Sequence, residues 1–321
     1  MSQRHLIIIP GTANALPPAK LLKIRESAPG FALHYMQNDS VTPGLLSETE
    51  IIFGCPRPET LCKAPRLGWL HLPFAGAGPY GDLRLYANQS VMLTNARGVY
   101  GAAAAEHVLG MALALLRRIP DYVRQQDRRE WARQEESREL SGSSVLVAGM
   151  GDLGKNTAAR FRAMGCRITG IRRNALERPP EADEIHPLHR LGALLPGAGI
   201  VINCLPATAH TEGVFNGDAF KAMRPGSIFI NAGQGAAVVE PALMEALTSG
   251  RLWGAAIDAA RREPLPGNHP FWTAPNLLIS PRAAAASPLV SARNFELFLD
   301  LLARYTAGRS LYNRVDFFSG Y

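Results

Sequence analysis

A glycine-rich turn between an apolar strand and a helix constrains the fold of this chain most strongly. The run Ser144–Ala148 has the pattern of a buried strand, and it leads through Gly149-Met-Gly-Asp-Leu-Gly154 into a helix predicted over 155–164. In a G-x-G-x-x-G turn, the first glycine permits the bend, the second lets a pyrophosphate approach the backbone, and the third lets helix and strand pack closely. The helix N-terminus supplies unpaired N–H groups for the phosphates. The pattern therefore predicts a dinucleotide-binding site.

Apolar runs alternate with helical patterns from one end of the chain to the other. Such alternation is typical of a parallel sheet covered by helices. A length of 321 residues favours about two α/β domains with a core each. We predict strands over 6–9, 32–35, 51–54, 69–72, 91–95, 144–148, 167–171, 200–205, 227–231, 254–258 and 277–280, and long helices over 102–118 and 288–305. The segment 121–139 carries nearly balanced charges and is expected to be a solvated helix face or a connector.

The net charge of the chain is +7, but it is concentrated in one place. The stretch 155–178 holds seven basic residues against a single acid, Glu177, so it carries nearly the whole excess. A protein that tracks a nucleic-acid backbone needs a broad basic face, and the remainder of this chain is close to neutral. We therefore expect no nucleic-acid partner.

Membrane, secreted and metal-binding classes are not indicated. The most apolar helical stretch, 101–116, contains Glu106 and His107 and is too short to cross a bilayer. The apolar run 6–9 stops at Pro10-Gly11, so no secretory signal is readable. The cysteines are Cys55, Cys62, Cys166 and Cys204. They form no C-x2-C pair and have no nearby histidine, so we expect a soluble, cytoplasmic protein without a metal site, a disulfide or a membrane partner.

Two arginines follow the second strand of the glycine-rich unit. An NAD enzyme places an acidic residue there, on the 2′-hydroxyl of the ribose, whereas this chain has Arg172 and Arg173. A guanidinium group can bind the 2′-phosphate of NADP with two hydrogen bonds and can stack on adenine. The alternative is a pair of ordinary surface arginines. The hypothesis is that NADP(H) is the cofactor, with NAD less favoured.

Further motifs resemble those of a known family. Around the glycine-rich turn stand, in this order, "GAG" at 76–78, "TNARG", "AEHVLGMAL", "NCLPATAHTEGVF", "FINAGQGAAVVEPAL", "AAIDAARREPLP", "PNLLISPRAAA" and the terminal "NRVDFFSGY". Over nearly its whole length the chain resembles the D-isomer-specific 2-hydroxyacid dehydrogenases. It is most similar to the glyoxylate/hydroxypyruvate reductase branch, in which "REPLP" and arginines after the second strand are usual.

The resemblance implies a particular domain organisation. The fold class is α/β with two Rossmann-like, doubly wound parallel-sheet domains. A discontinuous substrate-binding, catalytic domain is expected over 1–98 and 286–321, and a dinucleotide-binding domain over 99–285. The resemblance also implies a homodimer formed by the dinucleotide-binding domains, and a small-molecule substrate.

The resemblance assigns binding roles to particular residues. Backbone N–H groups of Ala77 and Gly78 bind the carboxylate of the substrate, and Asp258 holds the nicotinamide carboxamide. Trp272 matches a bulky side chain that shapes the substrate pocket, although an ordinary hydrophobic anchor is equally consistent with its position. The remaining expected cofactor-binding residues are Gly149, Gly151, Asp152, Leu153, Gly154, Arg172, Arg173, Leu205, Pro206, Thr208 and Ala232.

The expected catalytic positions depart from the family pattern. The family motif N-x-x-R-G has Gln234 in place of its arginine, and T-P-H has Arg282 in place of its histidine, while the glutamate of E-P-L is kept as Glu263. Glutamine is neutral and cannot offset the charge of a carboxylate. Arginine carries the charge but has a pKa above about 12, so it cannot serve as a general acid. The proton donor of the family is therefore missing from its usual place.

Three hypotheses remain open. The first is a reductase of small 2-oxo acids with an altered centre, in which Arg282 binds or polarises the substrate and the proton comes from elsewhere. The second is a nucleotide-binding protein that has lost the chemistry and serves as a sensor or partner, since fold and function are separable. The third is a nicotinamide enzyme for another substrate, such as an imine, with Gln234 setting the specificity. His107 is expected to be a packed, hydrogen-bonded residue rather than a catalytic one.

Overall fold

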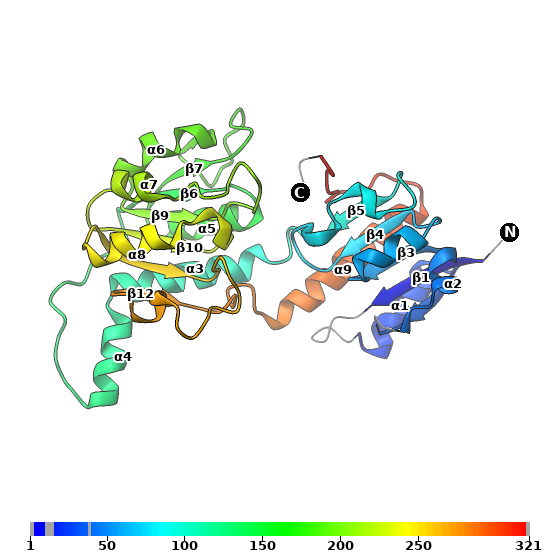
Figure 1. Cartoon of the computed structure of the whole chain (residues 1–321), viewed down its shortest axis with the longest axis horizontal. Helices are drawn as coiled ribbons and strands as arrows, with labels where there is room; N and C mark the ends of the chain where they lie inside the picture. The colour runs from blue at the N-terminus through cyan, green and yellow to red at the C-terminus, as the bar shows by residue number, and fades with distance from the viewer. Residues whose placement is uncertain (1–2, 10–15, 38–39, 319–321) are drawn as a thin grey trace. The chain divides into compact units, whose positions relative to one another are not determined.

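The computed structural model describes residues 3–9, 16–37 and 40–318 of the chain. Pro10 and Gly11, at which the first apolar run was expected to stop, lie outside the described residues, as do the last three residues of the terminal motif. The chain forms two compact units: unit 1 comprises 1–99 and 287–321, and unit 2 comprises 100–286. Each unit has its own sheet (Figure 1). Each also has its own buried apolar clusters.

Unit 1 contains a five-stranded sheet in the order β2-β1-β3-β4-β5, in which all neighbouring strands run parallel. This is one of the two common strand orders of doubly wound folds. Its strands and helices are β1 (Arg4–Ile9), α1 (Pro18–Ser27), β2 (Phe31–Tyr35), α2 (Pro43–Glu48), β3 (Thr49–Gly54), β4 (Trp69–Leu72), β5 (Met92–Asn95) and α9 (Pro288–Thr306).

Both faces of this sheet are covered, which explains its continuous apolar strands. Along β1 the side chains alternate: Ile7 packs in one cluster with Leu70, while Ile8 packs in the other with Trp69 and Phe298 of α9. Helix α9 lies more than 180 residues along the chain from the strands that it covers, and its orange ribbon lies beside the blue strands in Figure 1. The C-terminal segment therefore completes the core of unit 1.

Unit 2 contains a seven-stranded, entirely parallel sheet in the order β12-β11-β10-β9-β6-β7-β8. The chain reverses its direction across the sheet between β6 and β9, and doubly wound folds bind ligands at such a switch point. The strands are β6 (Ser144–Ala148), β7 (Arg167–Ile171), β8 (Glu184–His186), β9 (Ile200–Asn203), β10 (Ser227–Asn231), β11 (Leu252–Ile257) and β12 (Leu277–Ile279). The helices are α3 (Gly101–Leu116), α4 (Ile119–Arg128), α5 (Asp152–Ala163), α6 (Leu191–Leu194), α7 (Gly217–Ala222) and α8 (Glu240–Thr248).

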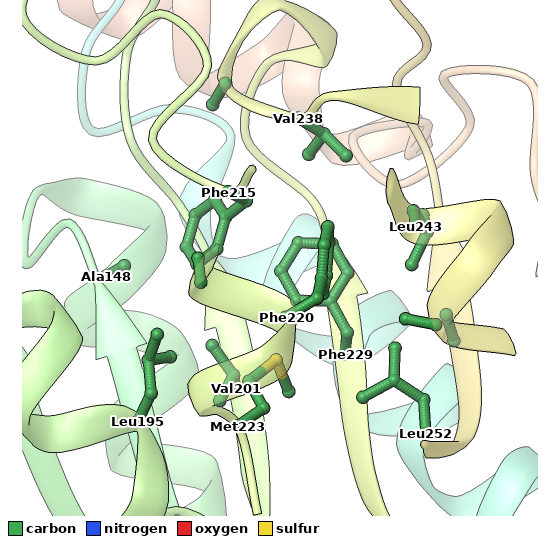
Figure 2. Packing of buried hydrophobic residues seen from close by; sticks show 14 of the residues in the cluster. Ala148, Leu195, Val201, Phe215, Phe220, Met223, Phe229, Val238, Leu243 and Leu252 are labelled. Carbon is green, nitrogen blue, oxygen red and sulfur yellow. The ribbon is translucent and has the colours of Figure 1, made fainter. Parts of the chain in front are cut away.

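An aromatic cluster fills one face of the sheet of unit 2 (Figure 2). Phe229 of β10 packs against Phe215 and, edge to face, against Phe220 of α7, with ring centroids 5.0 and 5.2 Å apart. Helices α3 and α5 cover the other face, where Phe161 is fully buried. Burying one such phenylalanine contributes about 1.5–3 kcal/mol. Packing on both faces therefore holds the sheet of unit 2 in place. The loops at the carboxyl ends of its strands can then position the residues of a binding site precisely.

The predicted fold class of two doubly wound parallel-sheet domains is confirmed. The predicted strands match the structure within a few residues, whereas the edge strand β8 was missed because it has only three residues and no apolar run. The segment 121–139 contains most of α4 and then an irregular connection. Within the described residues, no helix combines the length and the apolar character that a membrane span requires. The four cysteines are free thiols.

One buried histidine of unit 1 makes stability depend on pH. Burial lowers the pKa of His71, which is fully inaccessible, to about 3. Below pH 6.5 the unfolded chain takes up a proton at this residue and the folded chain does not. The contribution of His71 to the free energy of unfolding is therefore fully present above that pH and falls progressively as the pH is lowered toward 3. We expect this residue alone to lower the free energy of unfolding by about 2 kcal/mol between pH 7 and pH 5. Denaturant unfolding of wild type and His71→Gln measures it, and equal pH slopes in the two proteins would contradict it.

Candidate functional site

The glycine-rich turn leaves β6 at the switch point of the sheet of unit 2. Gly149 has a φ of +104°, and a side chain there would meet the carbonyl oxygen of Cys204 at 2.6 Å. A side chain on Gly154 would overlap the carbonyl oxygen of Gly149, so close packing of α5 requires glycine. A Cβ on Gly151, in contrast, would meet no atom within 4 Å in the described part of the chain. The turn is therefore tight where it faces the protein and open at Gly151, which fits the pyrophosphate of a dinucleotide.

The two residues after Gly151, Asp152 and Leu153, begin the first turn of α5. The Asp152 carboxylate accepts a hydrogen bond from the backbone N–H of Gly101, at 2.9 Å, so this side chain fixes the start of α3. Leu153 is half-buried. These side chains hold the helix in place, while its backbone N–H groups remain the groups suited to an anion.

Arg172 and Arg173 follow directly after β7. The backbone N–H of Arg172 donates to the carbonyl oxygen of His186 in β8, at 3.1 Å, which fixes the base of its side chain. Its guanidinium group contacts the carbonyl oxygen of Glu177 at 3.4 Å, a weak interaction. Arg172 is half-buried and Arg173 is exposed, so a phosphate can reach both.

A ladder of two buried asparagines, which no sequence motif indicated, aligns the neighbouring turns. Asn203 donates to the side-chain oxygen of Asn231 at 2.8 Å, and Asn231 donates to the carbonyl oxygen of Ala259 at 2.9 Å. The Asn203 side chain also accepts from the N–H of Leu205 at 3.0 Å. Each asparagine is the last residue of an apolar strand, and this position is the sequence feature from which the ladder could have been predicted. The ladder ties together the carboxyl ends of β9, β10 and β11.

The turns beyond this ladder contain three further expected cofactor residues. The backbone N–H of Ala232 donates to the carbonyl oxygen of Asn203, at 3.1 Å. The carbonyl oxygen of Pro206 accepts from the Thr211 hydroxyl at 2.6 Å, and the backbone N–H of Thr208 donates to that hydroxyl at 3.0 Å. The loop 205–211 is therefore held by its own hydrogen bonds.

Asp258 holds the turn that follows β12. Its Oδ1 accepts from the Ser280 hydroxyl at 2.7 Å and from the N–H groups of Ala283 and Ala284 at 2.7 and 3.1 Å, and its Oδ2 also accepts from Ala284. Because the Ser280 hydroxyl donates to Asp258, the His107 Nε2, 2.8 Å from that hydroxyl, must be the donor. His107 is thus hydrogen-bonded, as expected. Oδ2 thus accepts one hydrogen bond, whereas Oδ1 accepts three.

The three expected catalytic residues lie together in unit 2. The Arg282 Nε donates to Glu263 Oε2 at 2.5 Å, and its Nη2 donates to Gln234 Oε1 at 3.3 Å. The other oxygen of Glu263 accepts from the N–H of Ala260 at 3.1 Å. Arg282 has a φ of +52°, and its N–H donates to the carbonyl oxygen of Asp258. The turn locked by Asp258 therefore aims Arg282 between the other two side chains.

This cluster can bind an oxyanion but cannot protonate one. Arg282 uses two of its five N–H donors on Glu263 and Gln234, which leaves three for a ligand. Its side chain is 52% exposed, so a ligand has access. The Gln234 oxygen faces Arg282, so its NH₂ group is oriented to donate elsewhere. The cluster offers one cation that is already paired with one anion, together with a neutral amide.

The remaining expected substrate residues lie on other segments. Trp272 belongs to a short 3-10 helix, Pro270–Thr273, where its indole N–H donates to the carbonyl oxygen of Pro266 at 2.8 Å. It is 53% exposed, which does not fit a buried anchor. Ala77 and Gly78 lie in unit 1, where Ala77 precedes a 3-10 helix, Gly78–Tyr80, and Gly78, its first residue, has a φ of +52°. No acceptor in the described part of the chain is bonded to the N–H groups of these two residues.

A Rossmann-type sheet with this turn at its switch point defines a dinucleotide-binding protein. The family model described as "D-isomer specific 2-hydroxyacid dehydrogenase, NAD binding domain" matches residues 109–284, more than half of the chain. The chain belongs to this family of oxidoreductases, in its glyoxylate/hydroxypyruvate reductase branch.

Individual relatives agree with this assignment. A protein of Photorhabdus laumondii named glyoxylate/hydroxypyruvate reductase A is 35% identical over 58% of this chain and 58% of its own length. The chain is thus matched over less than two thirds of that relative. A D-isomer specific 2-hydroxyacid dehydrogenase family protein of Aeromonas salmonicida has a solved structure with 31% identity and a TM-score of 0.84, covering 98% of this chain and 100% of its own. An NADPH-dependent glyoxylate/hydroxypyruvate reductase of Sinorhizobium meliloti, solved with NADP and sulfate, has 27% identity and a TM-score of 0.82, covering 99% and 100%.

Proposed function

We propose that this protein is an NADP(H)-dependent reductase of small 2-oxo acids of the glyoxylate or hydroxypyruvate type, with an altered catalytic centre. The observation that carries the proposal is the position of Arg282 between Glu263 and Gln234, on the turn that Asp258 locks. An ordered cationic cluster of this kind fits an anionic substrate. The names of the Photorhabdus laumondii and Sinorhizobium meliloti relatives support the same substrate class.

The proposed cofactor residues belong to unit 2. Gly149, Gly151 and Gly154, with the first N–H groups of α5, would hold the pyrophosphate, and Arg172 and Arg173 would hold the 2′-phosphate. Asp258 would bind the carboxamide through Oδ2, its less occupied oxygen. When bound, NADPH supplies the hydride. The Sinorhizobium meliloti structure with NADP supports this preference.

The proposed substrate residues have two kinds of role: some bind the charged groups of the substrate, and others keep those residues in position. The N–H groups of Ala77 and Gly78 would bind the carboxylate, and Arg282 would polarise the carbonyl and stabilise the developing oxyanion. Gln234 would donate from its NH₂ group, and Glu263 would keep the guanidinium in position. Because Arg282 retains its proton, the product hydroxyl takes its proton from water or from another side chain.

The organisation of the enzyme follows from the same proposal. We infer that unit 2 is the dinucleotide-binding domain and that unit 1 is the discontinuous substrate-binding domain. A homodimer through unit 2 and a cytoplasmic location complete the proposal. The four free thiols support a reducing compartment.

NADPH oxidation against a panel of substrates tests the function. The panel holds glyoxylate, hydroxypyruvate, larger 2-oxo acids and several imines. We expect turnover above the free-cofactor background on a small 2-oxo acid. Tight NADPH binding without any turnover would instead favour a sensor, which the missing general acid makes the second candidate. Turnover on imines alone would favour Gln234 as a specificity residue for a different substrate.

A further inference from the structure

A line of four buried polar side chains lies in the core of unit 1. Trp69 and His71 come from β4, Thr94 comes from β5, and Asn294 comes from α9 (Figure 1). The first three are fully buried, and Asn294 is 6% exposed. The Thr94 hydroxyl lies 2.8 Å from the indole nitrogen of Trp69 and 2.8 Å from His71 Nδ1. The Asn294 amide donates to the carbonyl oxygen of Pro73 at 3.1 Å.

The direction of the hydrogen bonds along this line follows from which atoms can donate and which can accept. The indole N–H of Trp69 can only donate, so it donates to Thr94. Among the described residues the Thr94 hydroxyl has no other acceptor than His71 Nδ1, so its single proton goes to that nitrogen, which accepts it. A neutral His71 therefore carries its proton on Nε2. Burial keeps the imidazole neutral at physiological pH, because it lowers the pKa of His71 to about 3.

The next two polar atoms in the line have complementary roles, one as a donor and the other as an acceptor. His71 Nε2 and Asn294 Oδ1 are both buried without a hydrogen-bond partner at standard geometry within the described residues. One carries a proton and the other is an acceptor, and interaction with Asn294 raises the pKa of His71 against the larger effect of burial. An Asn294 side chain whose oxygen faces His71 directs its NH₂ group to Pro73. This orientation of the amide suits both neighbours: the N–H of His71 and the carbonyl oxygen of Pro73.

The line ends at the segment that leads into the "GAG" turn. Three successive carbonyl oxygens of this segment are held: Pro73 by Asn294, Phe74 by the N–H of Ala96 at 2.9 Å, and Ala75 by the side chain of Asn95 at 2.9 Å. Two of these donors follow from the end of β5, while Asn294 alone comes from α9. Ala77 and Gly78 lie directly beyond.

We propose that Asn294 and His71 are positioning residues, which fix the "GAG" turn so that the N–H groups of Ala77 and Gly78 converge on the substrate carboxylate. The inference rests on the proposed function for the role of these two N–H groups. It adds that α9, from the far end of the chain, controls how the carboxylate is bound.

Packing alone does not account for a histidine at this place. The His71 ring lies among Phe53, Trp69 and Phe298, with centroids 5.4, 6.1 and 5.8 Å away. A phenylalanine would fill the same aromatic site without the cost of burying an imidazole. Buried polar groups that are held in a directed chain instead select one arrangement of the parts they join.

Two measurements on four variants test the inference. Asn294→Leu removes the donor to Pro73, His71→Phe keeps an aromatic ring but removes the N–H, and His71→Gln restores an N–H at a similar distance. Tyr305→Phe is the matched control, because it removes a hydroxyl on the same helix that donates to Glu50, away from the turn. Hydrogen exchange of peptides covering 73–80 reports the turn directly, and steady-state kinetics with glyoxylate report carboxylate binding.

We expect Asn294→Leu and His71→Phe to accelerate exchange in 73–80 by about tenfold or more, and to raise KM for glyoxylate by about tenfold with little change in kcat. His71→Gln should recover most of both effects, and Tyr305→Phe should show neither. Unchanged exchange in folded Asn294→Leu and His71→Phe would overturn the inference, and so would equal changes in Tyr305→Phe. If exchange changes as expected while the wild type reduces no substrate, the proposed function fails and the bracing of the turn stands.

Discussion

Gln234→Arg combined with Arg282→His is expected to raise glyoxylate reduction by roughly 10²–10⁴-fold, the usual contribution of a positioned general acid. The two side chains are in contact, with Arg282 Nη2 3.3 Å from Gln234 Oε1, so the substitutions exchange the position of the cation within one cluster. Glu263 already binds the residue at position 282 and would be available to hold an imidazole. A carboxylate beside an imidazole also raises its pKa, which suits proton donation at neutral pH.

The single variants separate the two effects. Arg282→His alone supplies an acid without the substrate-binding cation, and Gln234→Arg alone places two guanidinium groups together, so neither should reach the rate of the pair. Steady-state NADPH oxidation with glyoxylate measures all three. A folded double variant that binds NADPH as wild type does, but reduces glyoxylate no faster, would show that the surrounding pocket has diverged as well.

Arg172→Ala combined with Arg173→Ala should weaken NADPH binding by roughly 10²-fold or more. Charge-assisted hydrogen bonds contribute about 1.5–3 kcal/mol each, and the 2′-phosphate would lose those made by both guanidinium groups. NADH lacks this phosphate, so its dissociation constant should change little. Titration of both cofactors by fluorescence or calorimetry gives the two constants.

The matched control is Arg167→Ala with Arg162→Ala, which removes the same charge from the same stretch of sequence. Arg167 pairs with Glu184 and Arg162 pairs with Asp183, so neither is expected to meet the phosphate. An equal loss of NADPH affinity in the control would indicate a general effect of net charge. Equal NADPH and NADH affinities in the wild type would contradict the NADP preference itself.

Local pattern predicted much of this fold because the parallel strands are apolar on both faces. The strand Trp69–Leu72 and the turn at Gly149 could be identified from short windows of sequence. Edge strand β8 could not, since three half-buried residues leave no periodic signal.

The candidate site likewise contains residues that the sequence predicted and contacts that it could not predict. The family resemblance indicated Gln234, Glu263 and Arg282, and the structure places them in contact. The bracing of the turns was not predictable, because it depends on pairs distant in sequence. Asn294 reaches Pro73 across 221 positions, and His107 reaches Ser280 across 173. Which polar residue of a helix meets which turn is decided by packing, not by local sequence.

The measurement that bears most directly on the central claim is the rate of NADPH oxidation with glyoxylate or hydroxypyruvate, compared between wild type and Arg282→Ala. We expect turnover above the free-cofactor background in the wild type. We also expect a loss of about 10²-fold or more in kcat/KM in the variant, because the guanidinium group of the cluster is removed. Tight NADPH binding with no turnover on either acid, or equal rates in the two proteins, would contradict it.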